Sequence, residues 1–357
     1  MAAQLTELSK EILQRNGDYD GHYRVWHFTE PRTKLSGYIA IHRKRRGKPS
    51  LGGTRFYPYA SKSGALTDVL RLSRAMSYKC AVSGLPYGGG KAVIIGDPQK
   101  IKTPELLRSY ALVVDSLKGQ FRTGEDVGTS EDDVQYMLTF SEYFVGKRGE
   151  AGDPSPYAAL SVFTILKEAI TIISTKKPFT RPTVRVRGVG KVGSALAELA
   201  DAAGMKVVVA DISRKAINTI KKKIPNVLSV PVGGITQFPT DIYSPCAVGT
   251  EFTFDSISDL GSVKIICGGA NNQLSSNAIA ESFFLAGILY VPDYLANAGG
   301  LIDVADELEP GGYQRARVYK KIKNLKIVFR KLHKESVRRK ESLQRTTERY
   351  ARKIVNK

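Results

Sequence analysis

The pattern of apolar and polar positions divides the chain into short predicted strands and helices. Residues 36–42 (SGYIAIH) alternate between the two kinds of side chain, as a half-buried strand does. Residues 92–95 (AVII) form an apolar strand candidate that ends at a Gly-Asp-Pro turn. Apolar side chains at helical spacing predict amphipathic helices over residues 1–14, 64–78, 103–118 and 131–145.

A second region, from Pro182 onward, alternates strands with helices. The strand TVRVR is followed by the helical pattern VGSALAELADAAG and the strand KVVVADI, which indicates a parallel α/β unit. Further short strands are predicted in DIYSPCA, VKIICGG and GILYVPD. A long apolar helix (SVFTILKEAITII) precedes this region, and the Asp-Pro-Ser-Pro breaker at residues 153–156 marks the expected domain boundary.

The composition is typical of a soluble protein with two domains. The chain has 357 residues, of which 42% are hydrophobic and 25% charged. Its cysteines, Cys80, Cys246 and Cys267, are far apart and form no CxxC pair, so we expect neither disulfides nor a metal site, and a reducing cytoplasm as the compartment. The N-terminus lacks the apolar run of a signal peptide, and we find no stretch of about 18 apolar residues, so no membrane span is predicted.

The formal net charge of +20 is concentrated at the C-terminus. Seventeen Lys or Arg side chains and three Glu lie between Gly311 and Lys357. Apolar residues at near-helical spacing predict that this tail is an amphipathic helix with a basic outer face. A solvated face is the favoured interpretation and a nucleic-acid partner is disfavoured, because the tail shows no regular aromatic-basic pattern and no reading motif. Contact with nucleic acid or another polyanion stays open as an alternative.

A glycine-rich sequence typical of dinucleotide binding follows the strand TVRVR. It comprises Gly188, Val189, Gly190, Lys191, Val192 and Gly193, and it opens the next predicted helix. Such glycines permit a tight turn, a close approach of the pyrophosphate to the backbone and close packing of the helix on the strand. Asp211, at the end of the second strand, would accept hydrogen bonds from the adenosine ribose and favour NAD over NADP, although Arg214 and Lys215 nearby would soften that preference.

A second cluster places Lys79 and Lys91 on either side of a glycine-rich, mostly apolar segment. It fails the phosphate-loop pattern, which would need glycine at Leu85 and Ser or Thr at Ala92. One ammonium group can bind a carboxylate, and a desolvated one can serve as a base. Two exposed loop lysines are the alternative when this cluster is taken alone. The turn at residues 123–129 adds an acidic pair, and Asn271-Asn272 follows the strand VKIICGG.

Taken together, these motifs resemble the glutamate/leucine/phenylalanine/valine dehydrogenase family, closest to its leucine and phenylalanine enzymes. The resemblance runs from Leu51 to Leu308. Its matching segments are LGGTRFYPY, MSYKCAVSGLPYGGGKAVIIGDP, TGEDVGTS, GDPSP, GVGKVG, DIYSPCA, GGANNQL and GILYVPDYLANAGGLIDVADEL, in the family's order.

The resemblance implies a two-domain α/β fold. Residues 1–150 would form the substrate-binding and catalytic domain, residues 151–310 a Rossmann NAD-binding domain, and residues 311–357 a basic helical segment that packs back toward the first domain. The cleft between the domains would close on the substrate and exclude water. The family forms homo-oligomers, so a homo-oligomer is expected.

The resemblance also implies residue roles. Lys91 would be the catalytic lysine that activates water, and Asp126 would relay protons to and from the amino nitrogen. Lys79 would bind the substrate carboxylate, with the backbone of Gly52 and Gly53 lining that site. Besides the glycine-rich segment and Asp211, cofactor contacts are implied for Cys246, Ala247, Asn271 and Asn272.

Four positions are implied to line the side-chain pocket, namely Leu51, Gly124, Leu301 and Val304. Glutamate enzymes carry lysine where Leu51 stands, and burying the distal carboxylate of glutamate without a partner is costly. Gly124 with Leu301 is similar to the combination in phenylalanine enzymes, where a missing methyl could make room for a ring. We therefore expect reversible NAD-dependent oxidative deamination of an apolar L-amino acid to the 2-oxo acid and ammonium, with phenylalanine slightly ahead of leucine as the substrate. The alternative is a binding protein derived from such an enzyme that uses its basic tail.

Overall fold

The computed structural model describes residues 3–175, 178–247 and 249–356. The chain folds into two compact units. The first unit contains the residues up to Pro154, the segment Asp303–Arg315 and the residues from Ala351 on. The second contains Ser155–Ile302 and Ala316–Tyr350.

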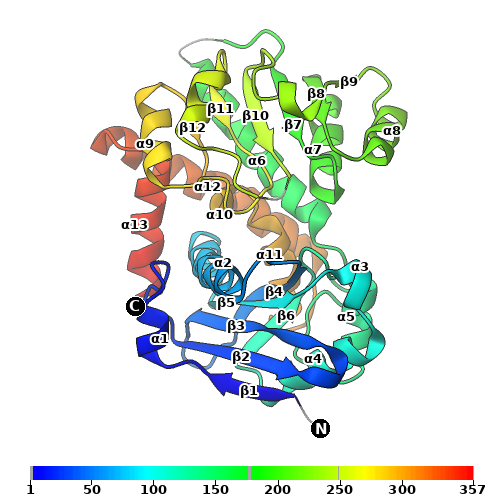
Figure 1. Cartoon of the computed structure of the whole chain (residues 1–357). Coiled ribbons are helices and arrows are strands. Elements are labelled where there is room, and N and C mark those ends of the chain that lie inside the picture. Colours follow the sequence, from blue (N-terminus) through cyan, green and yellow to red (C-terminus); the bar gives the residue numbers. More distant parts are fainter. Residues whose placement is uncertain (1–2, 176–177, 248, 357) are drawn as a thin grey trace. The chain divides into compact units, whose positions relative to one another are not determined.

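The first unit is built on a six-stranded mixed sheet in the order β1-β2-β3-β5-β4-β6 (Figure 1). β4 runs parallel to β5 and β6, and the other pairs are antiparallel. Its elements are β1 (Gln4–Glu7), α1 (Lys10–Gln14), β2 (Arg24–Glu30), η1 (Pro31–Thr33), β3 (Leu35–Arg43), β4 (Ser50–Tyr57), α2 (Lys62–Val82), β5 (Gly88–Ile95), α3 (Pro98–Ile101), α4 (Pro104–Ser116), β6 (Phe121–Gly124) and α5 (Glu131–Leu138).

Alternation along these strands sends side chains to two separate hydrophobic layers. Ile39 and Ile94 pack with the apolar face of α4 and with α5. Tyr38 and Val93, one position away on the same strands, pack with α2. Because successive side chains point to opposite faces of a sheet, α2 covers one face and α4 with α5 the other. Lys91 lies two residues before Val93, so it shares the face covered by α2.

The second unit contains a six-stranded parallel sheet in the order β12-β11-β10-β7-β8-β9 (Figure 1). This is the strand order of a doubly wound α/β fold, with the reversal of order between β7 and β10. Its elements are α6 (Ser155–Ser174), β7 (Thr183–Arg187), α7 (Lys191–Ala202), β8 (Lys206–Ala210), α8 (Arg214–Lys223), β9 (Leu228–Ser229), η2 (Val232–Gly234), β10 (Ile242–Pro245), η3 (Asp255–Leu260), β11 (Ile265–Ile266), α9 (Ala278–Leu285), β12 (Leu289–Tyr290) and α10 (Asp293–Ala296).

Three further helices contain the points where the chain changes unit. α11 (Gly299–Asp306) enters the first unit at Asp303, α12 (Arg315–Arg339) returns to the second, and α13 (Leu343–Val355) ends in the first from Ala351 on. The apolar positions of the basic tail, Val318, Ile322, Leu325, Phe329 and Leu332, are buried, which confirms the predicted amphipathic helix.

Most predicted elements are confirmed, and two are wrong. The predicted N-terminal helix is instead β1 followed by the short α1, because the segment at Gln4–Glu7 pairs with β2. The helix predicted over 131–145 ends at Leu138. Beyond it, the backbone of residues 143–145 runs along β6, where Thr123 donates to the Tyr143 carbonyl at 3.1 Å and accepts from Val145 at 2.8 Å. This pairing buries Phe144 in the layer beneath α4.

Helix α6 is long and apolar enough, by length and composition alone, to cross a membrane. In the second unit it packs against α7 and α10 and buries Val162, Ile165 and Leu166. It also carries the largely buried Glu168, which accepts a 2.8 Å hydrogen bond from Arg330 on α12. These contacts are those of a core helix, since a charged, ion-paired side chain is unfavourable in lipid.

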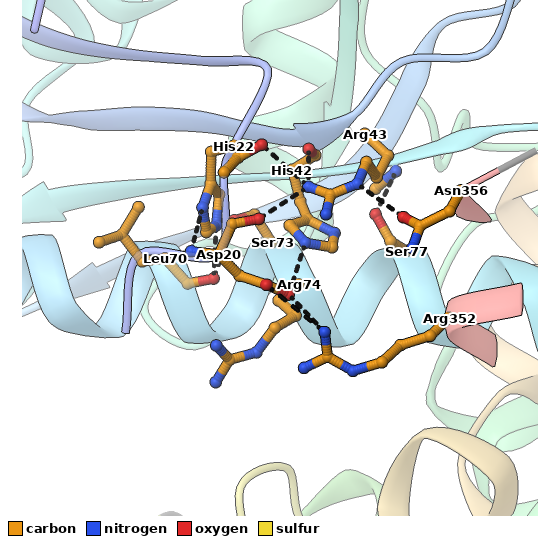
Figure 2. A network of polar contacts seen from close by, with 12 residues as sticks. Asp20, His22, His42, Arg43, Leu70, Ser73, Arg74, Ser77, Arg352 and Asn356 are labelled. Carbon is orange, nitrogen blue, oxygen red and sulfur yellow. Dashed lines mark hydrogen bonds and ion pairs between the residues drawn. The ribbon is translucent and has the colours of Figure 1, made fainter. Parts of the chain in front are cut away.

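The last residues of the chain join the first unit through a polar network (Figure 2). Asp20 lies between two cations or potential cations: His42 Nε2 is 3.3 Å and Arg352 Nη1 is 3.4 Å from its Oδ2. Arg43 Nε donates to the Asn356 side chain at 3.4 Å. His42 is completely buried, and burial lowers its pKa to about 4 although Asp20 opposes the shift. The network therefore holds a neutral imidazole against an ionised carboxylate.

Candidate active site

The centre of the candidate site is an ion pair on the face of the first sheet that α2 covers. Lys91 Nζ lies 2.9 Å from Asp126 Oδ1, and both side chains are at least four-fifths buried. Burial lowers the pKa of the Lys91 ammonium, and the charge of Asp126 opposes that shift. Burial would raise the pKa of Asp126, but the charges of Lys91 and Arg55 outweigh it and hold that pKa well below its usual range. The pair thus couples a desolvated amine to an ionised carboxylate.

Arg55 is the residue of this site that the sequence analysis missed. Its Nε donates to Asp126 Oδ2 at 2.9 Å, and its Nη1 donates to Asp68 Oδ2 on α2 at 3.0 Å. Tyr59 donates to the same Asp68 oxygen at 2.6 Å. This chain of charges fixes the orientation of Asp126 from the side opposite Lys91. Arg55 stands within the segment LGGTRFYPY, and the alternation of β4 places it on the same face as Gly53.

Glycine at 53 is required by the close approach of the ion pair to β4. A Cβ atom there would lie 2.6 Å from the Glu125 carbonyl oxygen, 2.9 Å from Asp126 Cβ and 3.3 Å from Lys91 Nζ. At Gly52 a Cβ would meet the Gly90 carbonyl oxygen at 1.8 Å. Both glycines therefore allow the strands and the catalytic candidates to come together.

The turn after β6 holds Asp126 through its own backbone. The Asp126 amide donates to Thr129 Oγ1 at 2.9 Å, and that hydroxyl donates to the Thr54 carbonyl of β4 at 2.7 Å. Gly128 has φ of +80°, and a Cβ there would lie 2.0 Å from the Phe56 carbonyl oxygen. The acidic turn that the sequence left ambiguous is thus anchored to β4.

Lys79 lies near the C-terminal end of α2, the helix that packs on β5, and its side chain is largely buried. The adjoining Ser77 accepts a hydrogen bond from the Gly89 amide at 3.1 Å, which ties this part of α2 to the strand that carries Lys91. The interpretation of both lysines as exposed loop residues is therefore wrong.

The positions implied to line the side-chain pocket divide between the two units. Leu51 and Gly124 lie on β4 and β6 of the first, where Gly124 pairs in register with Gly53. Val304 belongs to the first unit and Leu301 to the second. Leu51 and Leu301 are buried. A Cβ at Gly124 would lie 2.6 Å from the Val145 carbonyl oxygen, so this glycine makes room for Val145 and supplies no space of its own to a substrate.

A buried carboxyl group lies in the segment that α11 contributes to the first unit. Asp303 is completely buried, and its Oδ1 accepts a 2.8 Å hydrogen bond from Tyr313. Its Oδ2 has no hydrogen-bond partner among the described residues. Burial raises the pKa of Asp303 to about 8, and the charges of Glu307, Asp306 and Asp153 add to the effect. Asp303 is therefore protonated at neutral pH.

In the second unit, the glycine-rich segment follows β7 at the point where the strand order reverses, which is where doubly wound folds bind ligands. A Cβ at Gly193 would lie 1.9 Å from the Gly188 carbonyl oxygen, so the start of α7 packs directly on the turn. A Cβ at Gly190 would meet nothing within 4 Å. Gly190 is the N-cap of α7 and makes no side-chain cap hydrogen bond, and the N-terminus of a helix favours an anion. Val189, Lys191 and Val192 complete the segment.

The ends of the neighbouring strands adjoin this turn. Asp211, after β8, accepts hydrogen bonds from the amides of Val189 and Ser213, both at 2.7 Å. A Cβ at Gly188 would lie 2.7 Å from the amide nitrogen of Ala247, which follows β10. Cys246 accepts a 3.4 Å hydrogen bond from the Gly269 amide, and burial raises the pKa of its thiol to about 12. The thiol is therefore neutral and unsuited to act as a nucleophile.

The two asparagines at the end of β11 are held in place by side chains of α10 and the residue after it. Asn297 donates to Asn271 Oδ1 at 2.9 Å, and the Asn272 amide donates to Asp293 Oδ2 at 2.6 Å. Asn272 has φ of +54°, a left-handed conformation that asparagine tolerates. The glycine cradle, the side chain of Asp211 and these amides fit a dinucleotide. Among the described residues, no three His, Cys, Asp or Glu side chains gather as a metal site.

Comparison with known proteins identifies the family. The model of the Glu/Leu/Phe/Val dehydrogenase dimerisation domain matches residues 22–143, and that of the glutamate/leucine/phenylalanine/valine dehydrogenases matches residues 155–353. A valine dehydrogenase of Streptomyces coelicolor is 40% identical over 307 residues, which cover 85% of this chain and 84% of that protein. A phenylalanine dehydrogenase of Bacillus thermotolerans is 42% identical over 307 residues, 84% of this chain and 79% of that protein.

Among solved structures, an L-tryptophan dehydrogenase from Nostoc punctiforme has a TM-score of 0.74 and 34% identity, and the alignment covers 94% of this chain and 96% of that one. The fold and these similarities thus define a two-domain amino-acid dehydrogenase, an enzyme acting on CH–NH2 groups. The chain belongs to the Glu/Leu/Phe/Val dehydrogenase family.

Proposed function

We propose that this protein catalyses the reversible, NAD-dependent oxidative deamination of a large apolar L-amino acid to its 2-oxo acid and ammonium. The observation that carries this proposal is the buried ion pair of Lys91 and Asp126. In it the Lys91 amine is desolvated, and the Asp126 carboxylate is kept ionised by Lys91 and Arg55. That combination provides a base and a proton relay beside one another, as amine oxidation followed by hydrolysis requires.

The candidate site residues of the first unit have separate roles in this proposal. Lys79 binds the substrate carboxylate as a point charge, and the backbone of Gly52 and Gly53 lines that site. Asp126 takes a proton from the substrate amino group, and Arg55 keeps its carboxylate oriented. Bound NAD supplies the hydride acceptor. Lys91 then removes a proton from the water that attacks the imino carbon of the substrate, and Asp126 returns a proton to the departing nitrogen.

The second unit would hold the cofactor. The amides at the start of α7 bind the pyrophosphate, with Gly190 as the point of close approach, and Asp211 accepts hydrogen bonds from the adenosine ribose. A carboxylate at that position repels a 2′-phosphate, which supports NAD over NADP. Cys246, Ala247, Asn271 and Asn272 adjoin the same sheet edge and would contact the nicotinamide half.

The substrate is proposed on the apolar character of its pocket positions. Leu51 is buried, and a glutamate carboxylate placed beside it would lose its hydration without gaining a cation there. Phenylalanine stays slightly ahead of leucine only because Gly124 with Leu301 is similar to the combination in phenylalanine enzymes. Val145 fills the space beside Gly124, so the room for a ring has to come from other pocket positions. The named relatives act on valine, phenylalanine, leucine and tryptophan, so those four amino acids define the panel to test.

The test is NADH formation, followed at 340 nm, with L-phenylalanine, L-leucine, L-valine, L-tryptophan and L-glutamate and with NAD or NADP. We expect activity with at least one apolar amino acid and none with glutamate. Lys91→Ala should lower kcat by about 10²–10⁴-fold. Lys223→Ala, which removes a lysine paired with Glu198 at 2.7 Å, is the control and should retain full activity. An inactive wild type on the whole panel, or an active Lys91→Ala variant, would contradict the proposal.

We also propose that the enzyme is a homo-oligomer in the cytoplasm. The first unit contains the part of the chain, residues 22–143, that matches a dimerisation domain. Light scattering coupled to size-exclusion chromatography measures the molar mass directly. A single species at the 39.1 kDa of one chain would contradict this part of the proposal.

A further inference from the structure

The outward face of α12 carries a row of cations that only Ile327 interrupts. An α-helix turns by about 100° per residue, which places several residues of α12, counted from Lys320, within one narrow arc of the helix surface. These are Lys320, Lys323, Ile327, Arg330, Lys331, Lys334 and Arg338. We call the charged members the basic stripe. From Lys320 to Arg338 it extends about 27 Å along the helix axis at about 1.5 Å per residue. The opposite face is buried in the second unit.

The few acidic side chains nearby form ion pairs with arginines rather than with lysines. Between residues 316 and 350 the chain has thirteen Lys or Arg and three Glu. Glu335 pairs with Arg338 and Arg339, and Glu341 pairs with Arg345 and Arg349.

Arg330 pairs with Glu168 of α6. Within the part of the chain that the structure describes, no carboxylate forms an ion pair with Lys320, Lys323 or Lys334, and all three are exposed. Like charges three or four residues apart destabilise a helix unless an anion lies between them.

We propose that the basic stripe binds the phosphate backbone of double-stranded nucleic acid without reading its sequence. The spacing suits a polymer of regularly placed anions, because about 27 Å corresponds to about eight base pairs at about 3.4 Å per phosphate along a strand. The members of the stripe present cations and aliphatic carbon. The ring of Tyr350 lies beside them, but Lys331 Nζ stands over it at 5.5 Å from the centroid, so the stripe offers single-stranded bases no open row of stacking rings. It contains no aspartate or glutamate, and no side-chain set arranged to read base edges.

A lipid surface fits this face less well. Helices that lie in a membrane interface insert a continuous apolar face, and the apolar face of α12 is already buried by its own unit. Only Ile327 and Val337 expose large apolar side chains outward, at 58% and 56% of their surface. Two separate apolar side chains do not form a face that could insert into a lipid bilayer. The charged side chains therefore remain the feature of this surface that a partner would recognise.

The test measures fluorescence anisotropy of a labelled 24-base-pair duplex DNA of mixed sequence with the full-length protein at 50 and 200 mM KCl. If the stripe contacts about four phosphates, the affinity should fall about 10²-fold between these salt concentrations. The variant Lys320→Gln/Lys323→Gln/Lys334→Gln should bind at least tenfold more weakly at 50 mM KCl and show a shallower salt dependence.

The matched control is Lys206→Gln/Lys222→Gln/Lys264→Gln, which removes the same charge from exposed lysines of the same unit. It should bind within twofold of the wild type. Both variants should retain the dehydrogenase activity of the wild type, which shows that the fold is intact.

Absence of binding at 50 mM KCl, or equal weakening of both triple variants, would overturn the proposal. Tighter binding of a 24-nucleotide single strand, or binding to phosphatidylserine vesicles without binding to the duplex, would overturn it as well. None of these outcomes bears on the deamination reaction, which is measured separately.

Discussion

The buried carboxyl group of Asp303 should make the stability of the first unit depend on pH. Its pKa lies near 8 because burial disfavours the charged form, and Glu307, Asp306 and Asp153 add negative charge nearby. An aspartate in the unfolded chain ionises near pH 4. Between about pH 4 and about pH 8 the folded protein therefore retains a proton that the unfolded chain has lost, and the free energy of unfolding falls as the pH rises.

The size of this change in the free energy of unfolding follows from the difference between the pKa values of Asp303 in the folded and unfolded chain. Each pKa unit corresponds to about 1.4 kcal/mol, so a shift of about four units costs up to about 5 kcal/mol above pH 8. Asp303→Asn keeps the shape and a neutral acceptor for Tyr313 but cannot ionise. The difference in free energy of unfolding between the variant and the wild type should therefore grow by about 4 kcal/mol from pH 5 to pH 8, in favour of the variant.

Urea unfolding at pH 5, 6, 7 and 8, monitored by tryptophan fluorescence, measures this difference. The chain has one tryptophan, and Trp26 lies buried in β2 of the same unit, so the signal reports the unit that contains Asp303. Asp132→Asn, at a side chain that is 86% exposed, serves as the control and should show no such growth with pH. A difference between Asp303→Asn and wild type that stays constant from pH 5 to pH 8 would refute the reasoning.

Three further outcomes are expected. Gly53→Ala should lower kcat/KM by about 10²-fold, because its Cβ displaces the ion pair beneath it, whereas Gly17→Ala, where a Cβ meets nothing within 4 Å, should be neutral in the same assay. Asp20→Ala should lower the free energy of unfolding by about 1–3 kcal/mol, since it strands a buried imidazole and Arg352. The His42 hydrogen bond and the Arg352 charge hold the pKa of Asp20 far below its usual range against the effect of burial. This loss should therefore be full above about pH 4 and shrink steadily below it, and equal losses at about pH 2 and about pH 7 would argue against it. Asp211→Ser should raise the ratio of kcat/KM with NADP to that with NAD by tenfold or more, and an unchanged ratio would remove its assigned role.

The candidate site could be predicted from sequence only where neighbouring residues define it. The strand, glycine turn and helix around residues 188–193 form within one short segment, so their pattern identifies them without reference to the rest of the chain. The lysines at 79 and 91 were found as a pair because they flank one glycine-rich segment. Arg55 was missed since its partners are distant in sequence: Asp126 follows 71 residues later, and an arginine in an alternating strand has no local signal of its role.

The sequence by itself determined most of the elements, their order and the parallel character of the second sheet, because apolar periodicity and turn residues act over a few positions. It also singled out the two lysines, Asp126 and the glycine turn as candidate site residues, and their roles stay predictions. Only the tertiary structure decided which groups meet. It turned residues 143–145 from predicted helix into an extended segment along β6, it showed that Val145 occupies the space beside Gly124, and it brought Arg352 to Asp20, 332 residues away. Those contacts depend on the packing of distant segments, and the free energy of burial that selects them is absent from any local stretch of the chain.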